Sequence, residues 1–243
     1  MQVDTINAME GTLSDYDCPK CRNKGYIMYL RDDGTRCCSD CTCKPIRESV
    51  RNMKRSGLET VIAEKTFDAF RAETPWQKWM KQTAMDYAEK PEGWLLMSGQ
   101  SGCGKTHLCT AVCRELLLRR MEVCYISWRE EARFLGDFRA DAAERGKRME
   151  KLKESPVLYV DDLFKLPGGG KLGSVELSLA FELFNHRYHN HLPTIISTEL
   201  TRQALIGLDD GLGSRIVEMA GAHTCQIRED HARNYRVREL VQA

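Results

Sequence analysis

Short apolar runs alternate with helical patterns through the middle of the chain. Four runs of mostly apolar residues have the length and composition of buried strands, and they lie at residues 94–98, 123–127, 157–161 and 194–198. The sequence between them predicts helices at residues 105–120 and 174–190 and a long charged helical region at residues 130–154. Strands that are apolar throughout and separated by helices indicate a parallel sheet with helices on both faces. The sequence therefore predicts an α/β fold.

The first part of the chain has a different pattern. Residues 1–17 are polar and acidic, and we expect a frayed arm there. A helix is predicted at residues 44–57, with a proline in its first turn and a glycine at its end. The segment Thr-Phe-Asp-Ala-Phe at residues 66–70 then looks like the joint to a second unit. We predict two units, residues 1–65 and residues 66–243.

Charge and composition narrow the class of protein. The 243 residues include 36 Lys and Arg and 35 Asp and Glu, a formal net charge of +1. This balance excludes an overall basic coat, so any contact with nucleic acid must come from a local patch. The apolar runs are far too short to span a bilayer, and the acidic N-terminus has no apolar stretch typical of a signal peptide. We expect a cytoplasmic protein that does not enter a membrane.

Residues 99–106, Gly-Gln-Ser-Gly-Cys-Gly-Lys-Thr, have the spacing of a phosphate-binding P-loop. Glycines let the backbone curl so that N–H groups face a phosphate, and the following helix adds the positive end of its dipole. Lys105 is expected to reach the β- and γ-phosphates and Thr106 to bind Mg²⁺. We predict a site for ATP or ADP made by Gly99, Ser101, Gly102, Cys103, Gly104, Lys105 and Thr106.

Two carboxylates follow the predicted strand Val-Leu-Tyr-Val, at Asp161 and Asp162. Ligands of parallel sheets bind at the carboxyl ends of strands, so this pair should lie near the P-loop. We expect Asp161 to help hold Mg²⁺ and Asp162 to polarise the attacking water. Together with Lys105, the pair predicts a Mg²⁺-dependent ATPase.

Six of the eleven cysteines lie between residues 18 and 43. Without an export signal, such a cluster indicates a metal site in a reducing compartment. Cys18 and Cys21 have the spacing of a zinc knuckle, and zinc needs four ligands. Spacing alone favours Cys38 and Cys41 as the second pair. The other five cysteines are scattered through apolar surroundings and are expected to be small core residues.

Basic residues recur at three- and four-residue intervals after the cysteine cluster, so they share one face of the predicted helix. They are Lys44, Arg47, Arg51, Lys54 and Arg55. A basic face beside a zinc module meets nucleic acid or an acidic partner surface, or it is simply solvated.

The order of the motifs carries a family resemblance. They are Cys-Pro-Lys-Cys with Cys-Thr-Cys, Thr-Phe-Asp-Ala-Phe, the P-loop, the Asp-Asp strand, Thr-Ile-Ile-Ser-Thr-Glu-Leu, Gly-Ser-Arg-Ile and Asn-Tyr-Arg-Val-Arg. From Cys18 onward the chain resembles the AAA+ ATPases of the DnaC/DnaI helicase-loader type, most closely the DnaC-like replication proteins of phages and mobile elements. The resemblance implies an AAA+ domain, and because few residues follow Thr198, its lid is predicted to be minimal or absent.

The resemblance also implies a function and partners. Members of this family use ATP to load a hexameric replicative helicase onto single-stranded DNA. The N-terminal unit is then expected to contact the helicase, and the ATPase unit to associate with itself through the ATP site. In relatives the segment that corresponds to residues 130–154 lies near single-stranded DNA. This makes four residues candidates for DNA contacts, namely Arg139, Arg145, Lys147 and Arg148.

The resemblance assigns roles to single residues. Related proteins have Cys-x-Cys before a basic helix, which implies zinc ligands at Cys18, Cys21, Cys41 and Cys43, with Cys37 or Cys38 in reserve. The family position that senses the γ-phosphate is Thr198, with Ser197 beside it. Arg215 resembles the finger that reaches a neighbouring subunit's nucleotide, and Arg236 resembles the second sensor.

Two departures from the family pattern leave other functions open. Asp162 stands where many relatives have Glu, and Glu199 stands where many have Asn. A carboxylate that is one methylene shorter changes the position of the water, so hydrolysis is expected to be slow. One alternative is an ATP-dependent transposition helper of the IstB type, which shares the ATPase core but not the cysteine module. The other is a DNA-binding adaptor that holds ATP and scarcely hydrolyses it.

Overall fold

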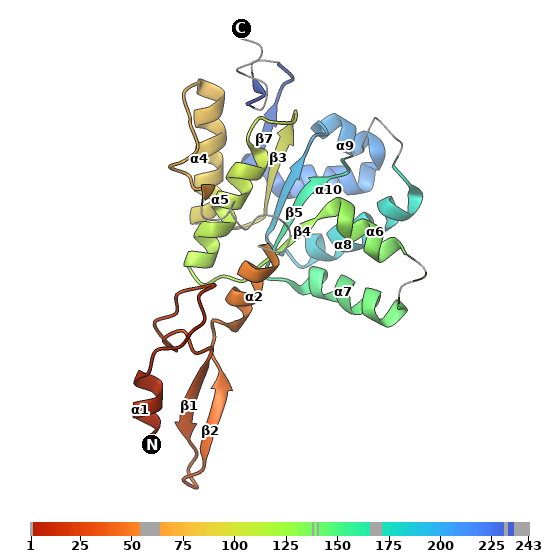
Figure 1. Cartoon of the computed structure of the whole chain (residues 1–243). Coiled ribbons are helices and arrows are strands. Elements are labelled where there is room, and N and C mark those ends of the chain that lie inside the picture. Colours follow the sequence, from red (N-terminus) through yellow and green to blue (C-terminus); the bar gives the residue numbers. More distant parts are fainter. Residues whose placement is uncertain are drawn as a thin grey trace.

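The computed structural model describes residues 2–53, 64–137, 139, 141–165, 172–230 and 233–235. Within them, five strands form a sheet with the order β4-β5-β6-β3-β7, and a two-stranded hairpin precedes it (Figure 1). The strands of the sheet are β3 (Trp94–Gly99), β4 (Val123–Ser127), β5 (Val157–Leu163), β6 (Thr194–Thr198) and β7 (Thr224–Ile227). Every neighbouring pair is parallel, which confirms the predicted α/β class.

The four predicted strands form where the sequence is apolar on both faces. All six residues of β3 are buried, and Leu96 pairs with Ile196 of β6 on one side and with Thr224 of β7 on the other. The sequence analysis does not predict β7. Its four residues, Thr-Cys-Gln-Ile, mix polar and apolar side chains, and only the pairing with β3 at the edge of the sheet makes them a strand.

Helices cover both faces of the sheet, as predicted. One layer contains α4 (Pro75–Glu89) and α5 (Lys105–Leu118). The opposite layer contains α6 (Trp128–Gly136), α7 (Ala142–Glu154), α8 (Ser174–His189), α9 (Arg202–Leu208) and α10 (Asp210–Ala220) (Figure 1). Alternate residues of β3 serve the two layers, because Leu95 and Met97 pack in the first core and Trp94 and Leu96 in the second. No described helix is long and apolar enough to cross a membrane.

The long charged helical region predicted at residues 130–154 consists of two helices. The first, α6, ends at Gly136, and Asp137 already has an extended backbone. The second, α7, begins after Asp141, whose side chain accepts a hydrogen bond from the N–H of Ala143 at 2.8 Å. This N-cap satisfies a donor that the start of a helix otherwise leaves free. The sequence pattern does not mark the break between α6 and α7, because charged residues are frequent in both helices.

The chain after β6 completes the sheet. Its described part forms α9, α10, a short 3-10 helix (Gly221–His223) and β7. Helix α10 packs on α8 and β3, so it belongs to the covering layer and not to a separate lid. This agrees with the prediction that a lid is minimal or absent.

The N-terminal residues are ordered, so the expected frayed arm is wrong. Helix α1 (Val3–Ala8) lies beside the hairpin of β1 (Tyr26–Leu30) and β2 (Arg36–Asp40). The side-chain amide of Asn7 donates to the carbonyl of Met28 at 2.8 Å and accepts from its N–H at 3.0 Å. The side chain of Asn7 thus holds α1 against β1. The spacing of apolar residues in the sequence does not predict this polar contact.

Helix α2 (Lys44–Met53) follows the hairpin. It forms at the predicted start, and the predicted end at residues 54–57 lies outside the described residues. Ile46 and Val50 are buried in the same apolar cluster as residues of α4 and α5, and α2 contacts β4. The boundary at residue 65 stays a prediction, because α2 follows the cysteine cluster and also packs on residues of the second unit.

A fully buried arginine ties the second helical layer together. Arg187 of α8 donates to the carbonyls of Leu152 and Ser155 at 2.9 Å each, to Pro193 at 2.7 Å and to the hydroxyl of Thr194 at 2.9 Å. Burial lowers the pKa of Arg187 to about 10, which still leaves the guanidinium charged at neutral pH. These bonds join the end of α7 to β6.

We expect Arg187→Met to destabilise the ATPase unit by roughly 3 to 5 kcal/mol, because it leaves buried carbonyls without donors. Urea denaturation followed by circular dichroism measures this free energy of unfolding. Lys78→Met, at an exposed position of α4, is the matched control and should change it by less than about 0.5 kcal/mol. Equal stability of the two variants would contradict the structural role of Arg187.

Candidate functional site

The predicted P-loop connects β3 to α5. Gly99, Gly102 and Gly104 all have positive φ, at 132°, 76° and 97°. At Gly99 a Cβ atom would lie 2.4 Å from the carbonyl oxygen of Ile227, so this position has neither the conformation nor the space for a side chain. The glycines of the motif are therefore required by the turn itself.

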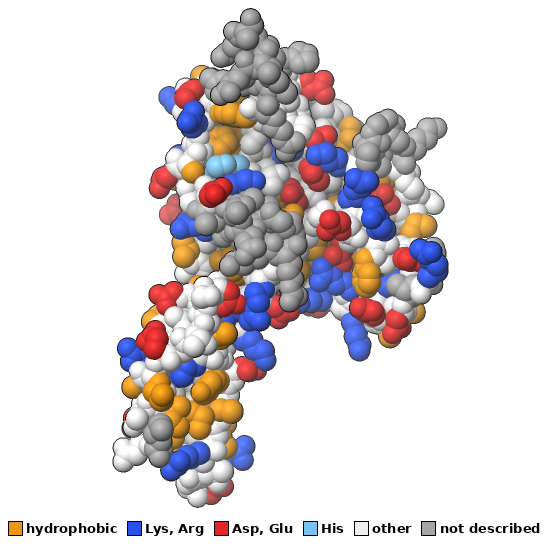
Figure 2. Space-filling model, in the orientation of Figure 1, with side chains coloured by type: hydrophobic (Ala, Val, Ile, Leu, Met, Phe, Trp, Pro, Cys, Tyr) orange, Lys and Arg blue, Asp and Glu red, His pale blue; other side chains and the backbone are white. Residues whose placement is uncertain are grey.

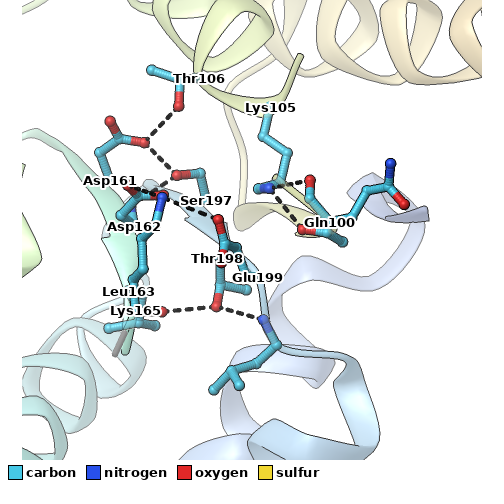
Figure 3. A network of polar contacts seen from close by, with 12 residues as sticks. Gln100, Lys105, Thr106, Asp161, Asp162, Leu163, Lys165, Ser197, Thr198 and Glu199 are labelled. Atoms are coloured by element: carbon cyan, nitrogen blue, oxygen red, sulfur yellow. Dashed lines mark hydrogen bonds and ion pairs between the residues drawn. The ribbon is translucent and has the colours of Figure 1, made fainter. Parts of the chain in front are cut away.

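The loop lines a cavity of about 270 Å³ at the carboxyl end of the sheet. Lys105 is only 5% exposed, and its ammonium donates to the carbonyls of Gly99 at 2.6 Å and Gln100 at 2.8 Å (Figure 3). Thr106 lies next to it, at the first turn of α5. Backbone N–H groups, a lysine and the start of a helix together suit a phosphate chain.

Asp161 is buried beside this cavity and contacts the P-loop residue Thr106. The hydroxyl of Thr106 donates to Asp161 at 3.1 Å, and Ser197 of β6 donates to the same carboxylate oxygen. Tyr159 donates at 2.8 Å, and Tyr125 contacts the second oxygen at 3.4 Å. Burial raises the pKa of both tyrosines, so they stay protonated donors at neutral pH. A hydroxyl and a carboxylate beside a phosphate site are oxygen ligands of the kind that Mg²⁺ prefers, so Thr106 and Asp161 fit this ion.

Asp162 occupies a strained position immediately after Asp161. Its φ is +53°, and the pairing of β5 with β6 shifts register between Val160 and Leu163. Its carboxylate forms an ion pair with Lys165 at 3.0 Å. Lys165 also pairs with Glu199, again at 3.0 Å (Figure 3). The sequence analysis missed Lys165, although its spacing of three residues from Asp162 was a possible signal.

The carboxylate of Glu199 faces the cavity in ionised form. Burial opposes ionisation of Glu199, but Lys165, Lys105 and Ser101 outweigh it and lower the pKa of this carboxyl. Burial likewise opposes the charge on Lys165, while Asp162 and Glu199 raise its pKa. Asp162, Lys165 and Glu199 thus form a bridge of three charged groups in the lining of the cavity.

Thr198 does not line the cavity, so its predicted contact with a γ-phosphate has no support in its position. Its side chain is fully buried, where its hydroxyl donates to the carbonyl of Leu163 at 2.8 Å and accepts from the N–H of Leu200 at 3.1 Å. Alternate strand residues point to opposite sides. Ser197 therefore contacts Asp161, and Glu199 after the strand lines the cavity.

Aromatic residues beside the loop form a second hollow that the sequence analysis missed. It has a volume of about 270 Å³ and is lined by Phe70, His107 and Tyr235 next to Gly102 and Gly104. Tyr235 reaches the loop, because its N–H donates to the carbonyl of Gly102 at 3.0 Å. Arg236, the predicted second sensor, follows directly but lies outside the described residues.

Arg215 lies in the layer opposite α5. On α10, its guanidinium stacks between Phe181 and Tyr188 of α8, with its central carbon 5.4 and 5.5 Å from the two ring centres. It also donates to the carbonyl of Gly211 at 3.2 Å. Arg215 is not among the described residues that line the P-loop cavity of its own chain. This position is compatible with a finger that acts on a neighbouring subunit.

The cysteine cluster brings together the four predicted ligands. The sulfur atoms of Cys18, Cys21, Cys41 and Cys43 all lie within 4.8 Å of one another, and all four residues are buried. Cys18 and Cys41 are 3.8 Å apart, and Cys21 and Cys43 are 3.7 Å apart. Tetrahedral zinc with bonds of about 2.3 Å places sulfurs roughly 3.8 Å apart, so the four thiols fit this ion.

The two other nearby cysteines lie elsewhere. Cys37 and Cys38 belong to β2, where Cys38 is exposed. The structure therefore places Cys41 and Cys43, rather than Cys38, beside Cys18 and Cys21, and the ligand set implied by the resemblance stays a prediction. Spacing misleads because the hairpin turns the side chains of β2 away from the cluster.

Arg47, in the middle of the basic face predicted on α2, is buried and does not belong to an exposed face. Arg47 is 1% exposed and donates to the sulfur of Cys43 at 3.3 Å, to Asn23 at 2.9 Å and to Asp15. Arg51 pairs with the same aspartate at 2.8 Å. An N–H donor to a ligand sulfur is the usual outer partner of a metal site, so Arg47 supports the cluster. Lys54 and Arg55 lie outside the described residues.

The four candidates for DNA contacts differ in their surroundings. Arg148 forms two hydrogen bonds with Glu131, at 2.6 and 2.7 Å, which hold α7 against α6. Arg139 pairs with Asp137 at 3.0 Å, and Arg145 donates to a carbonyl of α6. Lys147 is exposed. Figure 2 shows Lys and Arg side chains gathered on the side of the molecule that carries α6 and α7.

A P-loop before a helix, with a strand-end aspartate opposite it on a parallel sheet, defines a P-loop ATPase of AAA+ architecture. A family model for the bacterial DnaA ATPase domain matches residues 62–221. The chain therefore belongs to this family, and it is a DnaC-like AAA+ replication protein.

Individual relatives agree with this assignment. The chain is 31% identical to the phage-like element PBSX protein XkdC of Bacillus subtilis, over 90% of this chain and 85% of that protein. It is 26% identical to the replicative helicase loader DnaC of Escherichia coli K12, over 69% of this chain and 67% of that protein. Among solved structures, the replication initiator DnaA bound to AMPPCP and single-stranded DNA has a TM-score of 0.55 and 21% identity, over 73% of this chain and 53% of that one.

Proposed function

We propose that this protein uses ATP to load a hexameric replicative helicase onto single-stranded DNA. The observation that carries the proposal is the contact between Thr106 and Asp161 at the mouth of the P-loop cavity, within the fold of a DnaA-type ATPase. The similarity to a protein named as a helicase loader supports it. Residues 1–65 are the proposed helicase-contacting unit, and residues 66–243 the ATPase unit.

ATP is the proposed ligand of the P-loop cavity. Backbone N–H groups from Gly99 to Gly104 surround its phosphates, and Lys105 turns from the loop carbonyls to neutralise the β- and γ-phosphates. Thr106 and Asp161 would hold Mg²⁺, which would supply Lewis-acid stabilisation of the phosphate charge. Asp162 orients the attacking water. Phe70 and His107 offer the base an aromatic surface beside the loop.

Hydrolysis is proposed to depend on assembly. Arg215 is not among the residues that line the P-loop cavity of its own chain, and this supports the proposal that a neighbouring subunit's arginine completes each ATP site. Association through this site then couples ATP turnover to the state of the assembly. Single-stranded DNA is the proposed nucleic-acid partner, which the nucleotide-bound and DNA-bound DnaA structure of the same fold supports.

Lys105→Ala is the direct test of the ATP site. It removes the cation expected at the β- and γ-phosphates and leaves the backbone donors of the loop intact. We expect ATP affinity or turnover to fall at least tenfold, or about 1.4 kcal/mol. Equilibrium binding of a fluorescent ATP analogue and steady-state phosphate release measure the two quantities, with Lys78→Ala on α4 as the exposed control. Unchanged binding and turnover in Lys105→Ala would refute the assignment.

A binding adaptor that scarcely hydrolyses ATP is the second candidate function. The ion pair of Lys165 with Asp162 favours it, because a paired carboxylate is less free to orient water. The two functions separate in an assay of helicase transfer to single-stranded DNA. A loader needs ATP turnover for repeated transfer, whereas an adaptor co-purifies with the helicase and DNA at the same yield with ATP or with a non-hydrolysable analogue.

A further inference from the structure

The hairpin of β1 and β2 has one open edge. It projects away from the large sheet, with α1 on the side of β1 (Figure 1). Asn7 of α1 occupies the outer edge of β1, but within the described part of the chain nothing pairs with the outer edge of β2. Three exposed residues lie at alternate positions of this strand, namely Arg36, Cys38 and Asp40.

The main-chain groups of these three residues point to the open edge. Residues of an antiparallel pair alternate between positions that exchange hydrogen bonds with the neighbouring strand and positions that point away from it. The N–H of Cys41 donates to the carbonyl of Gly25 at 2.8 Å, so the odd-numbered residues of β2 face β1 and the even-numbered ones face outward. Asn7 agrees with this alternation, because it binds the outward N–H and carbonyl of Met28, the residue opposite Cys38.

The sequence of β2 does not protect this edge. Open edges are templates for another strand, and proteins block them with Pro, Lys or a bulge. The five residues of β2, Arg-Cys-Cys-Ser-Asp, contain neither Pro nor Lys and pair with β1 in one continuous register. Two strands alone make a marginally stable sheet, and this one leaves Tyr26 and Leu30 40% and 58% exposed. The edge therefore suits the addition of a further strand.

We propose that β2 pairs with β2 of a second copy of this chain, antiparallel and centred on Cys38. Such a pair is closed by a two-fold axis. Arg36 of each copy then lies opposite Asp40 of the other, so opposite charges meet at both ends of the pair. A shift that sets Arg36 opposite Arg36, or Asp40 opposite Asp40, brings like charges together. The charges of β2 therefore favour its own copy as the partner and select the centred register.

The contacts of Asp40 within its own chain permit this pairing. Its carboxylate forms an ion pair with Lys44 at 2.5 Å, and both side chains are more than half exposed. An exposed ion pair contributes little to stability, and a carboxylate can accept from a second donor. The pairing requires no nucleotide. It joins two chains through their hairpins, separately from the association proposed at the ATP site.

The test measures the association of the full chain by sedimentation equilibrium, with one equivalent of zinc and no nucleotide. We expect a monomer–dimer equilibrium with a Kd on the order of 10 μM, which is typical of a small transient interface. Cys38→Pro removes the N–H at the centre of the pair and should weaken dimerisation at least tenfold. Cys38→Ser keeps this N–H and is the matched control. Arg215→Ala should dimerise like the wild type, because the hairpin does not involve the ATP site.

Reversing the charges tests the register. Arg36→Asp sets two carboxylates opposite each other at both ends of the pair and should weaken dimerisation at least tenfold. Adding Asp40→Arg to this variant makes the charges complementary again and should recover most of the lost affinity. These two proteins decide the matter if circular dichroism shows that Cys38→Pro does not fold.

A bismaleimide with a short spacer tests the geometry. Opposite residues of a hydrogen-bonded antiparallel pair have Cα atoms about 5.5 Å apart, so the reagent should join Cys38 of one copy to Cys38 of the other. Cys37 points to the other face of the hairpin, since alternate strand residues do. Cys37→Ser should therefore keep the cross-linked dimer, and Cys38→Ser should lose it.

Specific results would overturn the proposal. They are a wild-type chain that stays monomeric at about 100 μM, equal dimerisation of folded Cys38→Pro and Cys38→Ser, or a cross-link that survives in Cys38→Ser. Failure of the charge exchange to restore dimerisation would overturn the centred register. A dimer that forms only with ATP and an intact Arg215 would overturn the pairing of hairpins while supporting the proposed association through the ATP site.

Discussion

Replacing Cys18 and Cys21 together by serine is expected to reduce the zinc content from one equivalent to none and to unfold the N-terminal unit. The four sulfurs are 3.7 to 3.8 Å apart in their closest pairs, and serine hydroxyls do not replace thiolates as ligands. Among the described hydrophobic residues outside the four cysteines, only Tyr16 and Ile27 pack against the cluster. So small a core folds on metal-binding energy, which is on the order of 10 kcal/mol for such modules.

Cys37→Ser with Cys38→Ser is the matched control, because it removes two thiols from the same unit without touching the cluster. Elemental analysis should find one equivalent of zinc in this control and none in the first variant. Limited proteolysis should cut the first variant within residues 1–65 while its ATPase unit still binds nucleotide. Full zinc in the Cys18 and Cys21 variant, or equal loss in both, would refute the site.

The sheet could be predicted because its central strands are apolar on both faces and separated by helices. Such runs need no partner to be recognised, whereas β7 becomes a strand only by pairing with the edge of β3. Helix α1 was missed for a similar reason, since the amide of Asn7 holds it on β1 from 21 residues away. Local pattern predicts elements that are stable by composition, and it misses those that depend on distant polar contacts.

In the candidate site, too, the contiguous motifs could be predicted and the contacts that depend on tertiary structure could not. The P-loop and the Asp-Asp pair are contiguous in sequence, so spacing alone places them. The bridge through Lys165 depends on the left-handed turn at Asp162 and on the register of β5 with β6, neither of which is written in a motif. Arg47 shows the reverse error, because helical spacing identifies a shared face but not that Asp15 and Asn23 cover it.

We expect Arg215→Ala to abolish ATP hydrolysis while leaving ATP binding in the isolated subunit unchanged. The P-loop cavity of the same chain does not include Arg215, so its loss leaves Lys105 and Thr106 intact. Arginines that act as fingers stabilise the charge of the transition state by roughly 10³-fold or more in rate. The change also removes the stacking on Phe181 and Tyr188, worth on the order of 1 kcal/mol of folding stability. Urea denaturation checks that the variant is still folded under assay conditions.

The role in trans is decided by mixing two inactive proteins. Arg215→Ala keeps an intact P-loop, and Lys105→Ala keeps an intact arginine. When subunits of the two exchange, some junctions pair the good P-loop of one with the good arginine of the other, so part of the wild-type turnover should return. As a control, each protein is mixed at the same concentration with a double variant that lacks both Lys105 and Arg215. Neither mixture should gain activity. If the first mixture stays as inactive as its parents while wild type is active, Arg215 acts within its own chain or only supports α10 against α8.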